Sequence, residues 1–184
     1  MVTEDFLKPE LIGPTLGFQP GMNIADFGCG SGEFSVYSAH KVGSEGHITA
    51  IDVRTEPLET LRAKLKAARL ENVTCARANL ELLGSTKLGD ASQDKVMLHN
   101  VLFQSQKKSE MLAEAFRVLK PGGEAVVIDW KKGSPARAGA GGFGPPDELR
   151  FAPHALEAIA IPLGFKKLRD FDCGRFHFGI IFIK

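Results

Sequence analysis

The segment Met22-Asn-Ile-Ala-Asp-Phe-Gly-Cys-Gly-Ser-Gly-Glu33 decides the fold of this chain. Its first half is an apolar run with an acid, Asp26, near the end, and its second half places glycine at every second position (Gly28, Gly30 and Gly32). Glycine lets the backbone turn sharply and removes the Cβ atoms that would hold a ligand away from it. The segment therefore predicts a strand, a glycine loop and a helix whose free N–H groups face a nucleotide-like ligand.

The spacing of the glycines separates two kinds of cofactor. A dinucleotide fingerprint has the form G-x-G-x-x-G, but Glu33 or Ser35 stands where its third glycine belongs. Asp26 supports the same distinction, because a carboxylate repels a pyrophosphate and attracts a cationic amino acid group. The glycine spacing and Asp26 therefore argue against a nicotinamide-dependent oxidoreductase. A turn that only connects a strand to a helix is the simplest alternative.

Three segments carry a resemblance to one enzyme family. Asp26-Phe-Gly-Cys-Gly-Ser-Gly32 resembles the first motif of class I S-adenosylmethionine-dependent methyltransferases. Residues 94–102 are similar to the family's fourth strand, and Phe116-Arg-Val-Leu-Lys-Pro-Gly-Gly123 is similar to the RVLKPGG signature of its small-molecule members, such as the ubiquinone/menaquinone-biosynthesis type. The resemblance implies S-adenosyl-L-methionine as the cofactor and a seven-stranded sheet whose last strand is antiparallel. It says little about the acceptor.

The rest of the chain alternates between strand-like and helix-like segments, which argues for a parallel sheet covered on both faces. With the strand number that the resemblance implies, we predict an α/β fold. It is a Rossmann-like, doubly wound, seven-stranded sheet, mostly parallel with an antiparallel C-terminal strand. Further strands are expected near residues 47–51, 72–77, 95–100 and 125–128, and as a hairpin within 165–182; helical spacing is found near residues 34–42, 58–68, 111–119 and 156–163.

The length of 184 residues suits a single domain, residues 1–184. Residues 1–21 are expected to form an N-terminal arm, and the glycine- and proline-rich residues 133–150 a flexible loop. Because that loop follows a strand at the expected ligand edge of the sheet, we predict that it covers the acceptor together with Phe6.

The composition limits the possible partners and the location. Lys and Arg number 23 against 22 Asp and Glu, a balance that gives no clear signal for nucleic acid or for an anionic membrane. The N-terminus lacks a signal-peptide pattern, and no apolar run approaches membrane-spanning length. The three cysteines (Cys29, Cys75 and Cys173) have no metal-binding spacing, so we predict no metal site and reduced thiols in a cytoplasmic protein. The oligomeric state cannot be predicted.

Open parallel sheets bind ligands beyond the carboxyl ends of their strands. Asp52 ends the second strand, where a carboxylate can accept both ribose hydroxyls, and Val53 can lie against the adenine. Asn79 follows the third strand and is expected at the adenine amino edge, and Asn100 ends the fourth and is expected at the methionine portion. The predicted cofactor-binding residues are Asp26, Gly28, Cys29, Gly30, Gly32, Asp52, Val53, Asn79, Leu80 and Asn100.

No catalytic residue can be assigned from the sequence. His99 is a candidate general base, although a histidine in a strand more often packs, and Trp130 either lines the acceptor pocket or packs. Phe103 and Gln104 stand where many relatives carry a histidine pair, so the role of that pair does not transfer to this chain. The motif for amino-group methylation of adenine or glutamine and the Pro-Cys pair of pyrimidine methylation are absent from the sequence, and the cysteine positions do not match arsenite methylation.

The sequence as a whole predicts methyl transfer to an unidentified, small-molecule acceptor by in-line displacement, for which alignment and exclusion of water matter most. Two alternatives stay open. One is a catalytically silent S-adenosylmethionine-binding module, and the other is the nicotinamide-dependent oxidoreductase.

Overall fold

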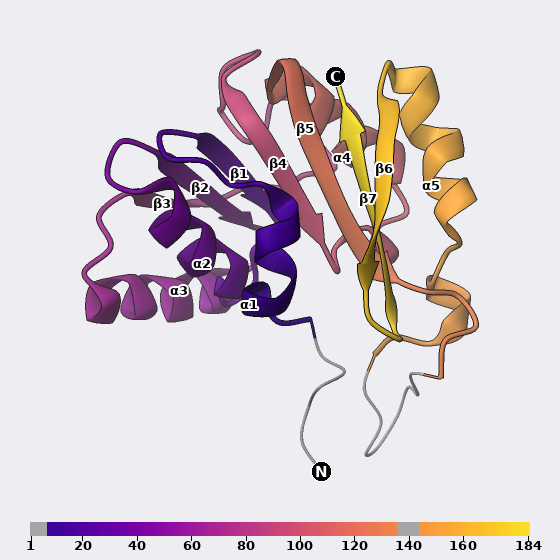
Figure 1. Ribbon diagram of the computed structural model, residues 1–184, viewed down its shortest axis with the longest axis horizontal. Coiled ribbons are helices and arrows are strands. Elements are labelled where there is room, and N and C mark those ends of the chain that lie inside the picture. The colour runs from indigo at the N-terminus through magenta and orange to yellow at the C-terminus, as the bar shows by residue number, and fades with distance from the viewer. Residues whose placement is uncertain (1–6, 136–143) are drawn as a thin grey trace.

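The computed structural model describes residues 7–135 and 144–184. Seven strands form one sheet in the order β3-β2-β1-β4-β5-β7-β6, as Figure 1 shows. All neighbours pair in parallel except β7, which is antiparallel to both β5 and β6. The strands are β1 (Asn23–Phe27), β2 (His47–Asp52), β3 (Val73–Arg77), β4 (Gln93–His99), β5 (Leu119–Trp130), β6 (Lys166–Cys173) and β7 (His177–Ile183).

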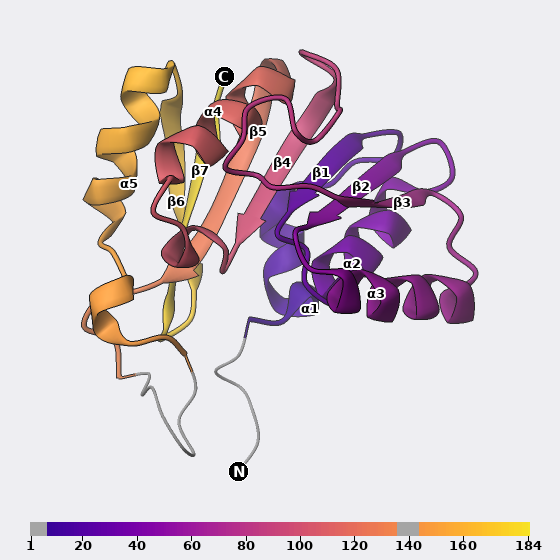
Figure 2. The same ribbon diagram turned by 180° about the vertical axis from the view of Figure 1, so that it is seen from behind.

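Helices pack on both faces of this sheet (Figures 1 and 2). Successive side chains of a strand point to opposite faces, and the core divides accordingly. On one face Ile24 and Met97 pack with the first helices of the chain, and on the other Phe27 and Leu98 pack with the later ones. The first group is α1 (Pro9–Ile12), α2 (Glu33–Val42) and α3 (Thr55–Ala68), and the second is α4 (Lys108–Val118) and α5 (Pro153–Ala160). The predicted doubly wound, mostly parallel sheet with an antiparallel C-terminal strand is confirmed.

The topology brings the ends of the parallel strands and the start of β7 to the same edge. The strands β3, β2, β1, β4 and β5 all end there, and β7 begins there because it runs in the opposite direction. Trp130, the last residue of β5, is paired with His177, the first residue of β7. Residues far apart in the sequence thus meet at the edge where open sheets bind ligands.

The N-terminal arm packs onto the sheet. Its helix α1 and the following 3₁₀ turn bury Ile12 and Leu16 against the core on the α2 side. Phe6, which we predicted to cover the acceptor, lies outside the described residues, whereas Leu7 lies at the cavity described below. Within the described residues, no helix is both long and apolar enough to cross a membrane.

The two flanks of the predicted loop are tied together by Arg150, whose residue exposure is only 4%. Its guanidinium donates to the carbonyl oxygen of Pro145 at 2.6 Å and to that of Ser134 at 3.0 Å. The guanidinium also lies 5.9 Å from the ring centre of Trp130. Residues 136–143 lie outside the described residues, so the predicted flexibility and cover remain predictions.

Candidate functional site

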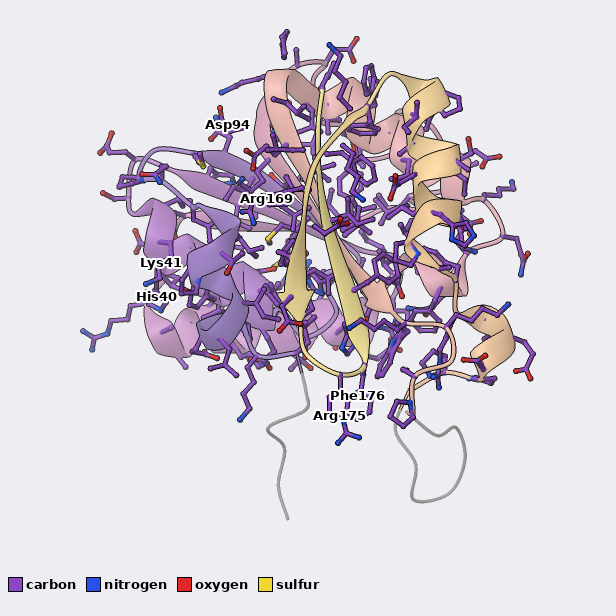
Figure 3. The ribbon with its side chains drawn as sticks, turned by 45° about the vertical axis from the view of Figure 1, so that its right-hand side comes forward. His40, Lys41, Asp94, Arg169, Arg175 and Phe176 are labelled. Atoms are coloured by element: carbon purple, nitrogen blue, oxygen red, sulfur yellow. The ribbon has the colours of Figure 1, made fainter. Side chains whose placement is uncertain are left out.

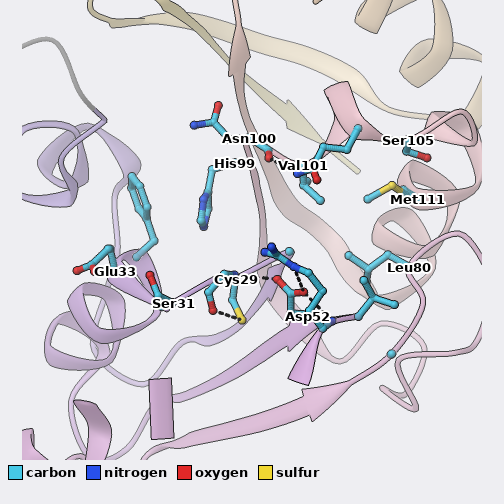
Figure 4. A pocket seen from close by; sticks show the side chains of 18 of the residues that line it. Cys29, Ser31, Glu33, Asp52, Leu80, His99, Asn100, Val101, Ser105 and Met111 are labelled. Carbon is cyan, nitrogen blue, oxygen red and sulfur yellow. Dashed lines mark hydrogen bonds and ion pairs between the residues drawn. The ribbon is translucent and has the colours of Figure 1, made fainter. Parts of the chain in front are cut away.

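A cavity of about 540 Å³ lies at the carboxyl edge of the sheet (Figure 4). It extends from the end of β2 across β1 and β4 to the junction of β5 and β7. All of the predicted cofactor-binding residues line it except Asp26, namely Gly28, Cys29, Gly30, Gly32, Asp52, Val53, Asn79, Leu80 and Asn100.

The glycine loop is shaped for a ligand. A side chain at these positions would either clash with the protein or project into the cavity. Gly28 and Gly30 have φ angles of +76° and +54°, which glycine adopts readily. A Cβ on Gly28 would come within 2.4 Å of the Val101 side chain. A Cβ on Gly30 would meet nothing within 4 Å, and Gly30 itself lines the cavity. The loop therefore presents bare backbone, followed directly by the N-terminus of α2, to whatever occupies the cavity.

Asp52 fixes this loop from the end of β2. Its Oδ2 accepts a hydrogen bond from the Gly30 N–H at 3.0 Å, and its Oδ1 accepts one from the Arg54 N–H at 2.9 Å. The side chain of Asp52 is 7% exposed. Oδ1 also lies 3.4 Å from Nε of the exposed Arg54 side chain. An ionised carboxylate has about four acceptor sites, so Oδ2 keeps free capacity and Oδ1 is shared with Arg54. A carboxylate with such capacity suits the hydroxyl groups of a ribose.

Asp26 lies behind the cavity rather than in its wall. It is fully buried, its Oδ2 accepts from the Ser35 hydroxyl at 2.6 Å, and its Oδ1 lies 2.8 Å from Nε2 of His99. His99 does line the cavity, with its ring centre 4.5 Å from that of Phe34. Burial and these two partners place Asp26 where it supports His99 and α2, and its predicted contact with a cofactor stays a prediction.

Two asparagines line the cavity, and they differ in burial and in hydrogen bonding. Asn79 is exposed and its Oδ1 accepts from the Glu81 N–H at 3.0 Å, so it forms a turn as well as lining the cavity. Asn100 has a φ angle of +50°, and its backbone N–H donates to the Ile128 carbonyl at 2.8 Å. Its Oδ1 is buried and has no hydrogen-bond partner within the described residues. Because buried polar atoms are nearly always paired, this oxygen points to a ligand donor.

Cys29 is a packing residue of the loop. Burial, with the charges of Asp26 and Asp52 adding to it, raises the pKa of the Cys29 thiol far above its ordinary value, so the thiol stays protonated. Across residues 7–135 and 144–184, no group of three or more His, Cys, Asp or Glu side chains is placed to hold a metal ion.

His177 is the site residue that the sequence did not indicate. It is 1% exposed, lines the far end of the cavity and has its ring centre 4.2 Å from that of Trp130. Burial, with a smaller effect from Lys131, lowers the pKa of His177 to about 4. Further cavity residues that the sequence did not indicate are Ser31, Glu33, Phe34, Arg54, Ala78, Glu81, Val101, Gln104, Ser105 and Met111.

Comparison with known proteins decides the family. A family model described as "Methyltransferase domain" matches residues 18–139, more than half of the chain. The chain belongs to this methyltransferase family. A solved S-adenosylmethionine-dependent methyltransferase from Aquifex aeolicus is 26% identical with a TM-score of 0.84, covering 96% of this chain and 89% of that one. Family and neighbour together give S-adenosylmethionine as the cofactor, as predicted.

The curated relatives of this methyltransferase are longer. A demethylmenaquinone methyltransferase from Listeria welshimeri is 36% identical over 111 residues, which are 60% of this chain and 46% of the relative. An arsenite methyltransferase from Aquipseudomonas alcaligenes is 35% identical over 123 residues, which are 65% of this chain and 35% of the relative. The methyltransferase chain therefore spans less than half the length of these relatives.

Proposed function

We propose that this methyltransferase transfers a methyl group from S-adenosylmethionine to a small-molecule acceptor by in-line displacement. The observation that carries the proposal is the extent of the cavity along the sheet edge. Asp52 ends β2 and His177 begins β7, four strand intervals away in the order β2-β1-β4-β5-β7. At a spacing of about 4.8 Å per strand, the two ends are roughly 19 Å apart. Such a row has space for a cofactor and a second molecule beside it.

The residues near β2 and β1 would hold the cofactor. Asp52 would accept the ribose hydroxyls, Val53 and Leu80 would lie along the adenine, and Asn79 would face its amino edge. The bare backbone of the glycine loop and the N-terminus of α2 suit the carboxylate of the amino acid portion. When bound, the cofactor supplies an electrophilic methyl group on a sulfonium, which leaves as a neutral thioether. The unpaired Oδ1 of Asn100 would accept from the ammonium group.

The chain's own contribution to the reaction would be alignment and the exclusion of water. Apolar side chains of Leu7, Val101 and Met111 line the cavity alongside its polar groups. A base is needed only if the acceptor must lose a proton. His99 is the best placed group for that task, because Asp26 on its Nε2 orients the ring and leaves Nδ1 unused by that contact.

An organic acceptor is favoured over arsenic. The arsenite relative raises the question whether the three cysteines of this chain could bind arsenic together. Cys75 lies on β3 and Cys173 on β6, the two opposite edges of the sheet, and Cys29 lies between them in the glycine loop. The three thiols therefore cannot meet at one ion. The demethylmenaquinone relative, by its name, supports an organic acceptor.

Two measurements test the proposal against its alternatives. Calorimetry should give tight binding of S-adenosylhomocysteine and weak or no binding of NAD, and the reverse order would support an oxidoreductase. A screen of candidate acceptors with label in the methyl group should then transfer the label to a small molecule. Binding without any turnover would support the silent module, and salt-sensitive labelling of bulk RNA would contradict a small-molecule acceptor.

A further inference from the structure

Three ring-bearing residues from adjacent strands share one face of the sheet at the cavity. His99 on β4 is in register with Ile128 on β5, two residues before Trp130, and Trp130 is in register with His177 on β7. Alternate residues of a strand share a face, so the three rings point the same way. All three line the cavity. The face is the one covered by α1 and α2.

His177 is the polar group of this row that lacks a partner. Both of its ring nitrogens are buried, and neither has a hydrogen-bond partner within the described residues. Its ring lies against the indole of Trp130, which packs with Phe176 and Phe103 in a small apolar cluster. Figure 3 shows Phe176 at the turn between β6 and β7, immediately before His177 in the chain. Leaving the nitrogens of a buried imidazole without hydrogen bonds costs free energy. A ligand that forms hydrogen bonds with them would remove this cost.

The cofactor is poorly placed to be that ligand. If Asp52 holds the ribose at β2 and the glycine loop holds the amino acid portion at β1, the sulfur lies one carbon beyond the ribose. The end of the row at β5 and β7 then lies beyond the reach of the cofactor, on the far side of β4. The molecule that reaches His177 is therefore the acceptor.

We propose that His177 binds the methyl acceptor, and that this acceptor is a neutral, flat, aromatic molecule carrying a hydroxyl group. The inference rests on the proposed function. The indole of Trp130 and the apolar cluster around it suit a flat ring. The imidazole offers one donor and one acceptor when neutral, and a hydroxyl can satisfy either. An ionised acceptor would pay a desolvation cost at this buried end of the cavity.

The neutral state of the imidazole agrees with this choice. The pKa of His177 is lowered to about 4, so the ring carries no charge at pH 7. Because the indole of Trp130 lies against the imidazole and both rings are nearly buried, the acceptor must displace the indole slightly to reach a ring nitrogen. The chain has one tryptophan, so its indole N–H signal reports this displacement without ambiguity.

A pair of matched probes tests the proposal on the full chain saturated with S-adenosylhomocysteine. The probes are 1-naphthol and 1-methylnaphthalene, which have similar shapes and differ in the hydroxyl. NMR titration should shift the indole N–H signal of Trp130 with both, and 1-naphthol should bind about fivefold more tightly, as expected for a neutral hydrogen bond. His177→Phe should remove this preference while the affinities for 1-methylnaphthalene and S-adenosylhomocysteine persist. His47→Phe, at the amino end of β2, should change none of them.

The outcomes are distinct. Equal affinity of the wild type for the two probes, absence of a Trp130 shift, or a hydroxyl preference that survives His177→Phe would each overturn the inference. If His177→Phe does not fold, His177→Leu, which also lacks a side-chain donor and acceptor, takes its place and should likewise lose the preference; a hydroxyl preference that survives in a folded His177→Leu would overturn the inference. Failure to bind S-adenosylhomocysteine would instead contradict the proposed function.

Discussion

Nε2 of His99 lies 2.8 Å from Oδ1 of Asp26, and this contact joins the end of β4 to β1 directly beneath the cavity. The second carboxylate oxygen of Asp26 accepts from the Ser35 hydroxyl on α2 at 2.6 Å. A single, fully buried carboxylate thereby connects two strands and the helix that follows the glycine loop. Its position couples the shape of the cavity to the stability of the core.

Asp26→Ala should therefore damage both the fold and the site. Loss of hydrogen bonds to an ionised group costs about 1.5–3 kcal/mol, and the freed His99 ring should loosen the cavity wall. We expect a lower free energy of unfolding in urea and weaker S-adenosylhomocysteine binding by calorimetry. Ser35→Ala, which removes one of the two partners, is the matched control and should cost less. A fully stable Asp26→Ala with weakened binding would instead indicate direct contact with the cofactor.

Asp52→Ala should weaken cofactor binding and leave the fold intact. The carboxylate lies at the end of β2 and accepts from the Gly30 N–H, but it is not part of the apolar core. If it also accepts the ribose hydroxyls, its removal should cost roughly 1.5–3 kcal/mol of binding free energy. Calorimetry with S-adenosylhomocysteine measures this, with circular dichroism as the check on folding. Unchanged affinity for S-adenosylhomocysteine would mean that Asp52 only holds the glycine loop and does not contact the cofactor.

His177 should make the stability of the free protein depend on pH. Its pKa is lowered from 6.5 to about 4 by burial, so between these values the unfolded chain binds a proton that the folded chain does not. Stability should thus fall as pH falls from about 6.5 to 4, by at most about 3 kcal/mol. His177→Phe should lack this part of the pH dependence, and His47→Phe should retain it. Urea unfolding across this range measures both, and identical slopes for wild type and His177→Phe would contradict the argument.

The sequence predicted those parts of the site that follow from local order. Gly28 and Asp52 could be found because a glycine loop and an acid at a strand end can be recognised from their immediate neighbours in the sequence. The position of Asp26 could not, because whether an acid near a strand end faces a ligand or a buried histidine depends on a partner, His99, 73 residues away. His177 was missed for the same reason. It reaches the cavity only because β7 returns antiparallel beside β5, so that the start of one strand meets the end of the other.

Gly30 offers the most direct test that the glycine loop is shaped for a ligand. It has a φ angle of +54°, and a Cβ built on it meets no atom within 4 Å. Gly17, which caps the 3₁₀ turn of the N-terminal arm, has a φ angle of +63° and an equally open Cβ position, but it does not line the cavity. The two glycines thus share the left-handed backbone and the open Cβ position, whereas only Gly30 lines the cavity and donates its N–H to Asp52.

Alanine at either position should therefore cost a similar amount of stability, about 1–2 kcal/mol, because both backbones are left-handed. At Gly30 the added methyl group also enters the space assigned to the cofactor, and overpacking of this kind typically costs about 1–3 kcal/mol. Calorimetry should show weaker S-adenosylhomocysteine binding for Gly30→Ala and unchanged binding for Gly17→Ala, with urea unfolding as the measure of strain. Equal affinities in the two variants would mean that the cofactor does not approach the loop backbone, and the assignment of this end of the cavity would have to be abandoned.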